Sequence, residues 1–125
     1  LPQQIKGKPS VYGRKILEKY KILEDLKSIE DSGVFAVVVE CTLESVVRNL
    51  LKINKVPIIG IGASKMCDGQ ILVTEDILGM TTFKSKFLKK YMNFNDKAKL
   101  ALLKYYKDVK NGKYPTKKYC YKWKL

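Results

Sequence analysis

The sequence predicts an α/β fold built on a parallel sheet, of which this chain supplies only a part. Two short runs, residues 34–39 and 57–62, are almost entirely apolar, and the first is rich in β-branched residues, as expected of strands covered on both faces. They alternate with segments of helical periodicity, which indicates parallel βα units. A third short strand follows them, and three strands are too few to close a barrel or complete a doubly wound sheet. We therefore expect further strands upstream.

The first expected element is a helix between Arg14 and Ser32, ended by Gly33. Its apolar residues recur every three or four positions and predict one buried stripe, which consists of Ile16, Tyr20, Leu23, Leu26 and Ile29. The buried strand at residues 34–39 follows. Thr42 then stands at the expected N-cap of a second helix, whose apolar positions are Leu43, Val46, Val47, Leu50 and Leu51.

The second expected strand covers residues 57–62, and a Gly-rich loop leads to a third at residues 70–73. The third strand follows the second too closely for a crossover helix, which is a departure from regular βα alternation. After Gly79, the spacing of Phe83, Phe87 and Tyr91 predicts another helix. A longer helix with Ala98, Leu102, Tyr105 and Val109 on one face should end near Gly112, and residues 118–125 form a basic, aromatic tail.

The formal net charge is +13, from 25 basic and 12 acidic residues. The excess gathers late in the chain, where residues 83–125 contain 14 lysines and no arginine. Specific nucleic-acid sites use the bidentate geometry of arginine, which lysine lacks, so a solvated lysine-rich face is favoured over a site for a polyanion. Binding of a polyanion remains the alternative.

Cysteine usage and hydropathy indicate the compartment. Cys41, Cys67 and Cys120 are odd in number and widely spaced, which fits neither a disulfide framework nor a Cys-x-x-Cys metal site, and we expect a reducing compartment. The longest apolar runs are far shorter than the roughly 20 residues of a membrane-spanning helix. The chain begins at Leu1 without the pattern of a signal peptide, and we interpret this start as a cut in a longer chain.

Histidine is absent, so a general base must be another side chain. Glu40 directly follows a predicted buried strand, and the carboxyl ends of parallel strands face the active site in such folds. A partly desolvated carboxylate there can act as a base; the alternative is a solvated or capping residue. The Gly60–Ser64 loop is better explained as a tight turn than as a phosphate cradle. The carboxylates Asp68, Glu75 and Asp76 could bind a metal or hydrogen-bond within loops.

Seven segments together resemble one enzyme family in order and spacing. They are residues 7–14 (GKPSVYGR), 37–41 (VVVEC), 56–64 (VPIIGIGAS), 67–73 (CDGQILV), 76–80 (DILGM), 87–91 (FLKKY) and 111–115 (NGKYP). The chain resembles the C-terminal half of ketopantoate hydroxymethyltransferase. The resemblance implies a (β/α)8 TIM barrel, of which this chain carries the last three strands and the C-terminal helices. Residues 1–115 would be half of one barrel domain and residues 116–125 its tail.

The resemblance also implies an activity in pantothenate and coenzyme A biosynthesis. Such enzymes bind 3-methyl-2-oxobutanoate to Mg2+, whose charge makes a C3 proton easier to remove. Glu40 matches the family's proton acceptor. The enolate then attacks the one-carbon unit of 5,10-methylenetetrahydrofolate, which gives 2-dehydropantoate and tetrahydrofolate.

Other functional groups of the family match nothing in this chain. The magnesium ligands and the known substrate contacts belong to the first half of the barrel, so we expect the isolated 125-residue chain to be inactive. Ser64 and Glu75 stand where the family usually has glycine and histidine, and we expect tuning rather than loss of function. Relatives generally form homo-oligomers and are cytoplasmic in bacteria, or organellar in some eukaryotes.

Two alternatives from other classes stay open. The first is a basic module whose lysines, with Tyr119, Tyr121 and Trp123, bind a nucleic-acid strand by charge and stacking. The second is a degenerate half-barrel without activity. Affinity for an oligonucleotide that survives about 0.3 M salt would favour the first, because non-specific charge pairing weakens steeply with salt.

Overall fold

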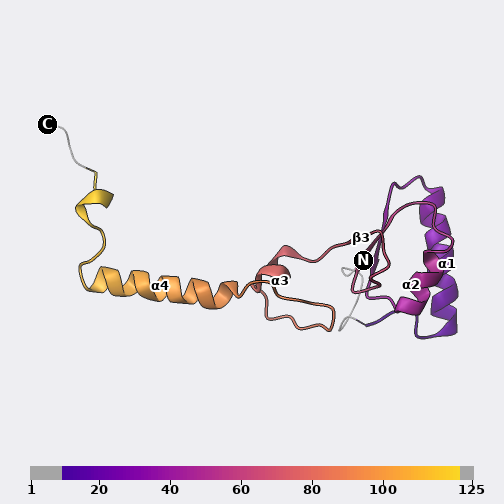
Figure 1. Cartoon of the computed structure of the whole chain (residues 1–125), viewed down its shortest axis with the longest axis horizontal. Helices are drawn as coiled ribbons and strands as arrows, with labels where there is room; N and C mark the ends of the chain where they lie inside the picture. The colour runs from indigo at the N-terminus through magenta and orange to yellow at the C-terminus, as the bar shows by residue number, and fades with distance from the viewer. Residues whose placement is uncertain (1–9, 122–125) are drawn as a thin grey trace. The chain divides into compact units, whose positions relative to one another are not determined.

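The computed structural model describes residues 10–121, which form two compact units (Figure 1). The first contains the residues up to Val73 together with Lys84–Leu88, and the second contains Thr74–Phe83 with the residues from Lys89 onward.

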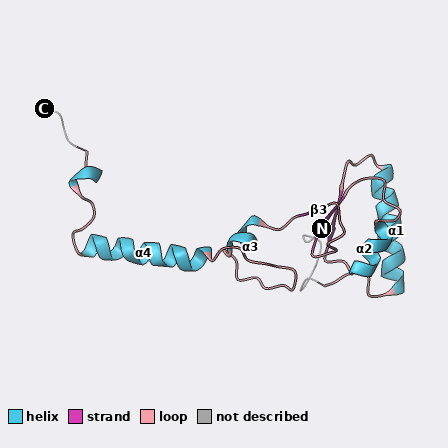
Figure 2. Ribbon diagram, in the orientation of Figure 1, coloured by secondary structure: helices cyan, strands magenta, loops and turns pink. Residues whose placement is uncertain are grey.

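The first unit is a small α/β layer (Figure 2). Its elements are α1 (Ile16–Asp31), β1 (Val37–Glu40), α2 (Glu44–Leu50), β2 (Ile58–Ile61) and β3 (Gly69–Gln70). The three strands are parallel and lie in the order β1-β2-β3, with Val37 paired to Ile58 and Ile59 paired to Gly69. The predicted α/β class and the order helix, strand, helix, strand, strand are confirmed.

One face of this sheet is packed against α1 and α2. The core residues are Leu26, Val37, Val39, Val47, Leu50, Ile58 and Cys67. Val47 and Ile58 are completely buried, and each such side chain contributes about 1.5–3 kcal/mol through removal from water. The alternation of β1 explains this arrangement, because Val37 and Val39 point toward the helices while Val38 and Glu40 point to the opposite face.

The prediction that residues 34–39 are covered on both faces is wrong for the described residues. The strand begins at Val37, Phe35 is 92% exposed and Val38 is 57% exposed. The physical reason is that the helices supply only one layer for these side chains to pack against. The predicted stripe of α1 is likewise only partly correct: Leu26 is buried and Leu23 packs against the core, whereas Ile16 and Tyr20 are exposed.

Two local predictions need correction. Leu43, rather than Thr42, occupies the N-cap position of α2. The Thr42 hydroxyl instead donates a hydrogen bond to the main-chain oxygen of Glu40 at 3.0 Å. The third strand also differs, because β3 covers only Gly69–Gln70 instead of the predicted residues 70–73.

The second unit contains α3 (Thr74–Leu78), α4 (Phe94–Lys110) and the short 3-10 helix η2 (Lys117–Tyr119). The predicted long helix is confirmed as α4, and it ends at Asn111 and Gly112, where φ is +66°. The last predicted segment lies partly outside the described residues, since these end at residue 121. Within the described part, Tyr114 packs against Tyr105 and Tyr119, with ring centroids 5.5 and 5.6 Å apart.

The predicted helix through Phe83, Phe87 and Tyr91 is wrong, because this segment is a loop and the helix lies before Gly79, as α3. Gly79 has a φ of +72°, and the Met80 amide donates to the Glu75 oxygen at 2.8 Å, which ends the helix. The Tyr91 amide then donates to the Ile77 oxygen at 2.9 Å, so the loop returns to the end of α3.

Candidate active site

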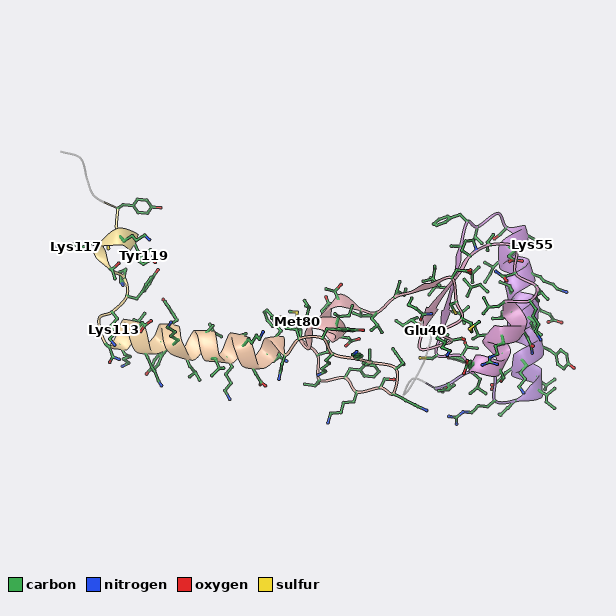
Figure 3. The ribbon with its side chains drawn as sticks, viewed as in Figure 1. Glu40, Lys55, Met80, Lys113, Lys117 and Tyr119 are labelled. Carbon is green, nitrogen blue, oxygen red and sulfur yellow. The ribbon has the colours of Figure 1, made fainter. Side chains whose placement is uncertain are left out.

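Glu40 is the last residue of β1 and lies on the face of the sheet opposite the helices (Figure 3). It is half-buried, and its partner in β2 is Ile61. The prediction that Glu40 stands at the carboxyl end of a strand is therefore confirmed. The ends of parallel strands collect at one edge of a sheet, which is where ligands bind in folds of this class.

The backbone turns sharply directly after Glu40. Cys41 has a φ of +47°, a left-handed conformation that residues other than glycine, asparagine and aspartate seldom adopt. Its amide still donates to the Ile61 oxygen of β2 at 2.9 Å. The peptide between Glu40 and Cys41 is thus held at both polar atoms, because the Thr42 hydroxyl binds its oxygen.

Tyr12 fixes the next residues from the other side. Its amide donates to the Cys41 oxygen at 2.8 Å, and its oxygen accepts from the Leu43 amide at 3.0 Å. These two bonds form a parallel bridge between Tyr12 and Thr42. Gly13 has a φ of +87°, and a Cβ at this position would lie 2.6 Å from Val46, so only glycine allows this close approach to α2.

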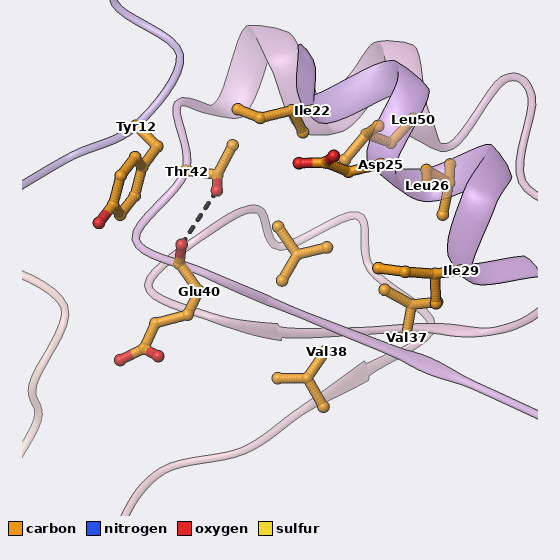
Figure 4. Close-up of a pocket in the computed structure, with 11 residues that line it drawn as sticks. Tyr12, Ile22, Asp25, Leu26, Ile29, Val37, Val38, Glu40, Thr42 and Leu50 are labelled. Carbon is orange, nitrogen blue, oxygen red and sulfur yellow. Dashed lines mark hydrogen bonds between the residues drawn. The ribbon is translucent and has the colours of Figure 1, made fainter. Parts of the chain in front are cut away.

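A cavity of about 200 Å³ adjoins this turn (Figure 4). Its apolar walls come from α1, β1 and α2, and Tyr12, Thr42 and Glu40 lie at one end. The Glu40 carboxylate itself points away from the helices, toward the opposite face of the sheet. Asp25 of α1 is the other charged residue of the lining. An apolar cavity with a few convergent polar groups is the usual form of a small-molecule site.

The electrostatics of the turn argue against Cys41 as a base or a nucleophile. Burial raises the pKa of the Cys41 thiol above its ordinary value, and the neighbouring Glu40 carboxylate raises it further. A buried thiol that keeps its proton is a poor nucleophile and a poor base. All three cysteines are free, and Cys41 and Cys67 are buried while Cys120 is exposed.

The Gly60–Ser64 loop uses its own polar groups to hold a turn. The Ser64 hydroxyl accepts from the Met66 amide at 3.1 Å, and the Gln70 side chain donates to the Ser64 oxygen at 2.8 Å. Gly62 has a φ of +61°, and a Cβ there would lie 2.6 Å from the ring of Phe87. These contacts support the tight-turn interpretation and leave little space for a phosphate.

The carboxylates considered as metal ligands are not brought together. Asp68 accepts a hydrogen bond from the Ile58 amide at 2.8 Å, and Asp76 accepts one from the Thr81 hydroxyl. Within residues 10–121, no three acidic, cysteine or histidine side chains lie close enough to hold a metal ion. The described residues therefore do not fit a magnesium site. The expected hydrogen bonding within loops is only partly correct, because Asp68 binds the first residue of β2 and Asp76, on α3, binds Thr81 in the loop that follows. No helix in this same part of the chain is long and apolar enough to cross a bilayer.

Sequence reasoning missed the left-handed turn at Cys41 and the bridge from Tyr12. Cysteine carries no preference for positive φ, so no local signal marks the turn. The bridge joins residues 30 positions apart through main-chain atoms, which no side-chain pattern reveals. The only available signal was Gly13 next to Tyr12, which indicated that the backbone approaches another element closely.

Comparison with known proteins gives a consistent match. The family model described as ketopantoate hydroxymethyltransferase matches residues 1–117. A 3-methyl-2-oxobutanoate hydroxymethyltransferase of Pelagibacter ubique (strain HTCC1062) is 48% identical over 109 residues, which cover 87% of this chain and 42% of that protein.

Two further relatives carry the same name. The protein of Bordetella petrii is 40% identical over 97% of this chain and 45% of its own length. The protein of Kosmotoga olearia is 41% identical over 91% of this chain and 44% of its own length. The chain therefore spans less than half the length of these relatives.

Proposed function

The chain belongs to the ketopantoate hydroxymethyltransferase family, and we propose that it is part of an enzyme that transfers a hydroxymethyl group to 3-methyl-2-oxobutanoate. The donor would be 5,10-methylenetetrahydrofolate and the products 2-dehydropantoate and tetrahydrofolate. This reaction would place the enzyme in pantothenate biosynthesis. The observation that carries the proposal from the structure is the position of the half-buried Glu40 at the carboxyl end of β1, on the face of the sheet opposite the helices.

Glu40 has the chemistry required of the proton acceptor. A C3 proton next to a keto group is weakly acidic, and a carboxylate within reach of such a proton can act as a general base. In the proposed step, a Glu40 oxygen takes this proton, and the electrons of the C–H bond form the enolate. The enolate then forms a carbon–carbon bond with the methylene carbon of the folate, and water supplies the hydroxyl oxygen of the product. Both carbon–nitrogen bonds of that methylene group break, and the two folate nitrogens take up one proton from the water and the proton removed from C3, which gives tetrahydrofolate.

We further propose that β1, β2 and β3 are the sixth, seventh and eighth strands of a (β/α)8 barrel. Three features support this. The strands are parallel, β1 is an edge of the described sheet, and its face opposite the helices carries the exposed Val38 beside Glu40. In a closed barrel that face would point inward and a neighbouring strand would pair with β1. Residues 1–115 would belong to the barrel domain and residues 116–125 to its tail.

The proposal also includes Mg2+ and the half of the relatives' length that this chain does not match. The family resemblance implies Mg2+, yet the described residues assemble no site for it, so its ligands would come from the region of the relatives that this chain does not match. On this basis the isolated 125-residue chain is expected to show no turnover. Measurable Mg2+-dependent turnover by the isolated chain would contradict this arrangement.

The cellular setting is proposed by analogy with the family. We expect a homo-oligomer located in the cytoplasm, or in an organelle if the source is eukaryotic. Its small-molecule partners would be the oxo acid and the folate, without a nucleic acid or a membrane. Size-exclusion chromatography with light scattering on the full-length protein tests the oligomeric state, and a monomeric mass would contradict it.

Product formation by the full-length protein tests the function. The assay mixes the oxo acid, the folate and Mg2+, and measures 2-dehydropantoate by mass spectrometry for the wild type, Glu40→Gln and Glu44→Gln. Glu44 is a matched control, because it is an exposed carboxylate paired with Arg48 four residues along α2. We expect a loss of at least about 1,000-fold for Glu40→Gln, within the range of general-base contributions, and no loss for Glu44→Gln. An inactive wild type would contradict the proposed function.

A further inference from the structure

The left-handed turn at Cys41 decides what lies next to the Glu40 carboxylate. In an extended strand, residues two positions apart share a face, so a strand that continued past Glu40 would place residue 42 on the same face as Glu40. The φ of +47° at Cys41 prevents this continuation. Thr42 is instead buried beside Tyr12, and its hydroxyl turns back to the Glu40 oxygen (Figure 4).

The turn is fixed at each of its peptide groups. The Cys41 amide donates to Ile61 of β2, and the Cys41 oxygen accepts from the Tyr12 amide. The Leu43 amide binds the Tyr12 oxygen, and this leucine is already the N-cap of α2. Strand β2, the Tyr12 segment and α2 therefore all contribute to holding a backbone conformation that cysteine seldom adopts. Unusual conformations held by their surroundings in this way are typical of functional sites.

We infer that Cys41 is a positioning residue, whose left-handed backbone ends β1 at Glu40 and keeps the carboxylate uncovered and fixed for proton transfer. The inference rests on the proposed function. It concerns the main chain at Cys41, because the side chain is a buried thiol in the core and not a group that meets the substrate. A base must be held within a fraction of an ångström of its productive position, so a change of backbone at the next residue alters the rate more than the binding of substrate.

Three substitutions at this position separate backbone conformation from packing. Glycine adopts positive φ freely, alanine adopts it with difficulty, and valine, which is β-branched, resists it most. Side-chain size gives a different order, since alanine is nearest to cysteine in volume and glycine is farthest. A role in packing therefore predicts that glycine is tolerated worst, whereas a role in backbone positioning predicts that glycine is tolerated best.

The experiment uses the full-length enzyme with Mg2+ and 3-methyl-2-oxobutanoate in D2O, and measures the exchange of the C3 proton for Cys41→Gly, Cys41→Ala and Cys41→Val. We expect exchange rate constants within about threefold of the wild type for Cys41→Gly and Cys41→Ala, with Cys41→Gly at least as fast. Cys41→Val should lose at least about tenfold in rate, with a KM within about threefold. If Cys41→Val does not fold, the comparison of glycine with alanine still decides the question.

The outcomes distinguish this inference from the proposed function. Exchange that requires Glu40 but proceeds at the wild-type rate in folded Cys41→Val would overturn the inference alone. A folded Cys41→Gly that exchanges about tenfold slower than Cys41→Ala would also overturn it, because side-chain volume would then govern the rate. If the wild type shows no exchange at all, the proposed function fails, and the positioning role fails with it.

Discussion

The two units of this chain are stabilised in different ways. Among residues 10–121, every buried hydrophobic residue belongs to the first unit, where α1 and α2 cover one face of the sheet. In the second unit, α4 has 17 residues and none of them is buried. The first unit is thus stabilised by a shared apolar core, whereas the described part of the second unit is stabilised by local main-chain hydrogen bonds and a few aromatic contacts.

This difference matters for function, because the candidate base lies in the packed unit. Glu40 belongs to β1, whose residues that face the helices are buried. The turn after Glu40 is held by β2, by the segment around Tyr12 and by the start of α2. A side chain that takes part in a reaction must be positioned more accurately than the side chains of an exposed helix. The following substitutions test the contrast between the units, in order of decreasing expected effect on the free energy of unfolding of the full-length protein.

Truncation of a core leucine should have the largest effect. Leu50 is 1% exposed and packs in the core, so Leu50→Ala is expected to cost about 2–5 kcal/mol, from lost burial and the cavity left behind. Leu100 of α4 is 68% exposed, and Leu100→Ala should change stability by less than about 0.5 kcal/mol. Urea denaturation of both variants measures the difference. A large loss for Leu100→Ala would mean that another surface covers α4 in the full-length protein.

Two glycines with similar backbone angles isolate the effect of packing. Gly62 and Gly112 have φ values of +61° and +66°, so alanine costs about 1–2 kcal/mol at both from the left-handed conformation. A Cβ at Gly62 would lie 2.6 Å from the Phe87 ring, whereas one at Gly112 meets nothing within 4 Å. Gly62→Ala should therefore lose about 1 kcal/mol more than Gly112→Ala in thermal or urea unfolding. Equal losses would show that Phe87 moves aside freely.

A hydrogen-bonded link between α1 and the segment before β2 should have a smaller effect. One oxygen of Glu30 in α1 accepts from the Lys55 amide at 2.6 Å and from the Val56 amide at 3.3 Å, just before β2. We expect Glu30→Gln to cost about 1–2 kcal/mol, because a charged acceptor is replaced by a weaker one. Asp31→Asn is the control, since Asp31 makes only an exposed pair with Lys55 at 3.9 Å and should cost less than about 0.5 kcal/mol. Similar losses for both would argue against the link.

Alkaline pH should have the smallest effect. Because burial raises the pKa of the Cys41 thiol, the folded protein binds this proton more tightly than the unfolded chain does. The stability that depends on this proton is full below the ordinary pKa of 9.0 and is lost as the pH rises from there through the folded value. Urea midpoints at pH 8 and pH 10 should therefore fall more for the wild type than for Cys41→Ala. An equal fall in both proteins would mean that the Cys41 thiol does not contribute.

The sequence was most informative where the local pattern was clear. Helices α1 and α4 follow from apolar periodicity, strands β1 and β2 follow from continuous apolar runs, and Glu40 was correctly expected at the end of a strand. The resemblance to the family was carried by short motifs rather than by periodicity, and the matched family model confirms it.

The failures have a common physical cause in contacts between distant residues. Phe83, Phe87 and Tyr91 have helical spacing, but Phe87 packs on Gly62 and the segment forms a loop. Residues 34–39 are apolar throughout, yet only one face of this segment is covered in the described part of the chain. Whether the second face is covered depends on strands other than the three described strands. The turn at Cys41 likewise depends on Tyr12 and β2 rather than on any preference of cysteine itself.

The most direct test of Glu40 as the base is the exchange of the C3 proton of 3-methyl-2-oxobutanoate in D2O with Mg2+, without the folate, followed by NMR. This isolates the proton transfer from the later carbon–carbon bond formation. The full-length wild type should exchange the proton in a reaction that requires Mg2+, and Glu40→Gln should lose at least about 1,000-fold in rate. Full exchange by the folded Glu40→Gln variant would show that another group removes the proton.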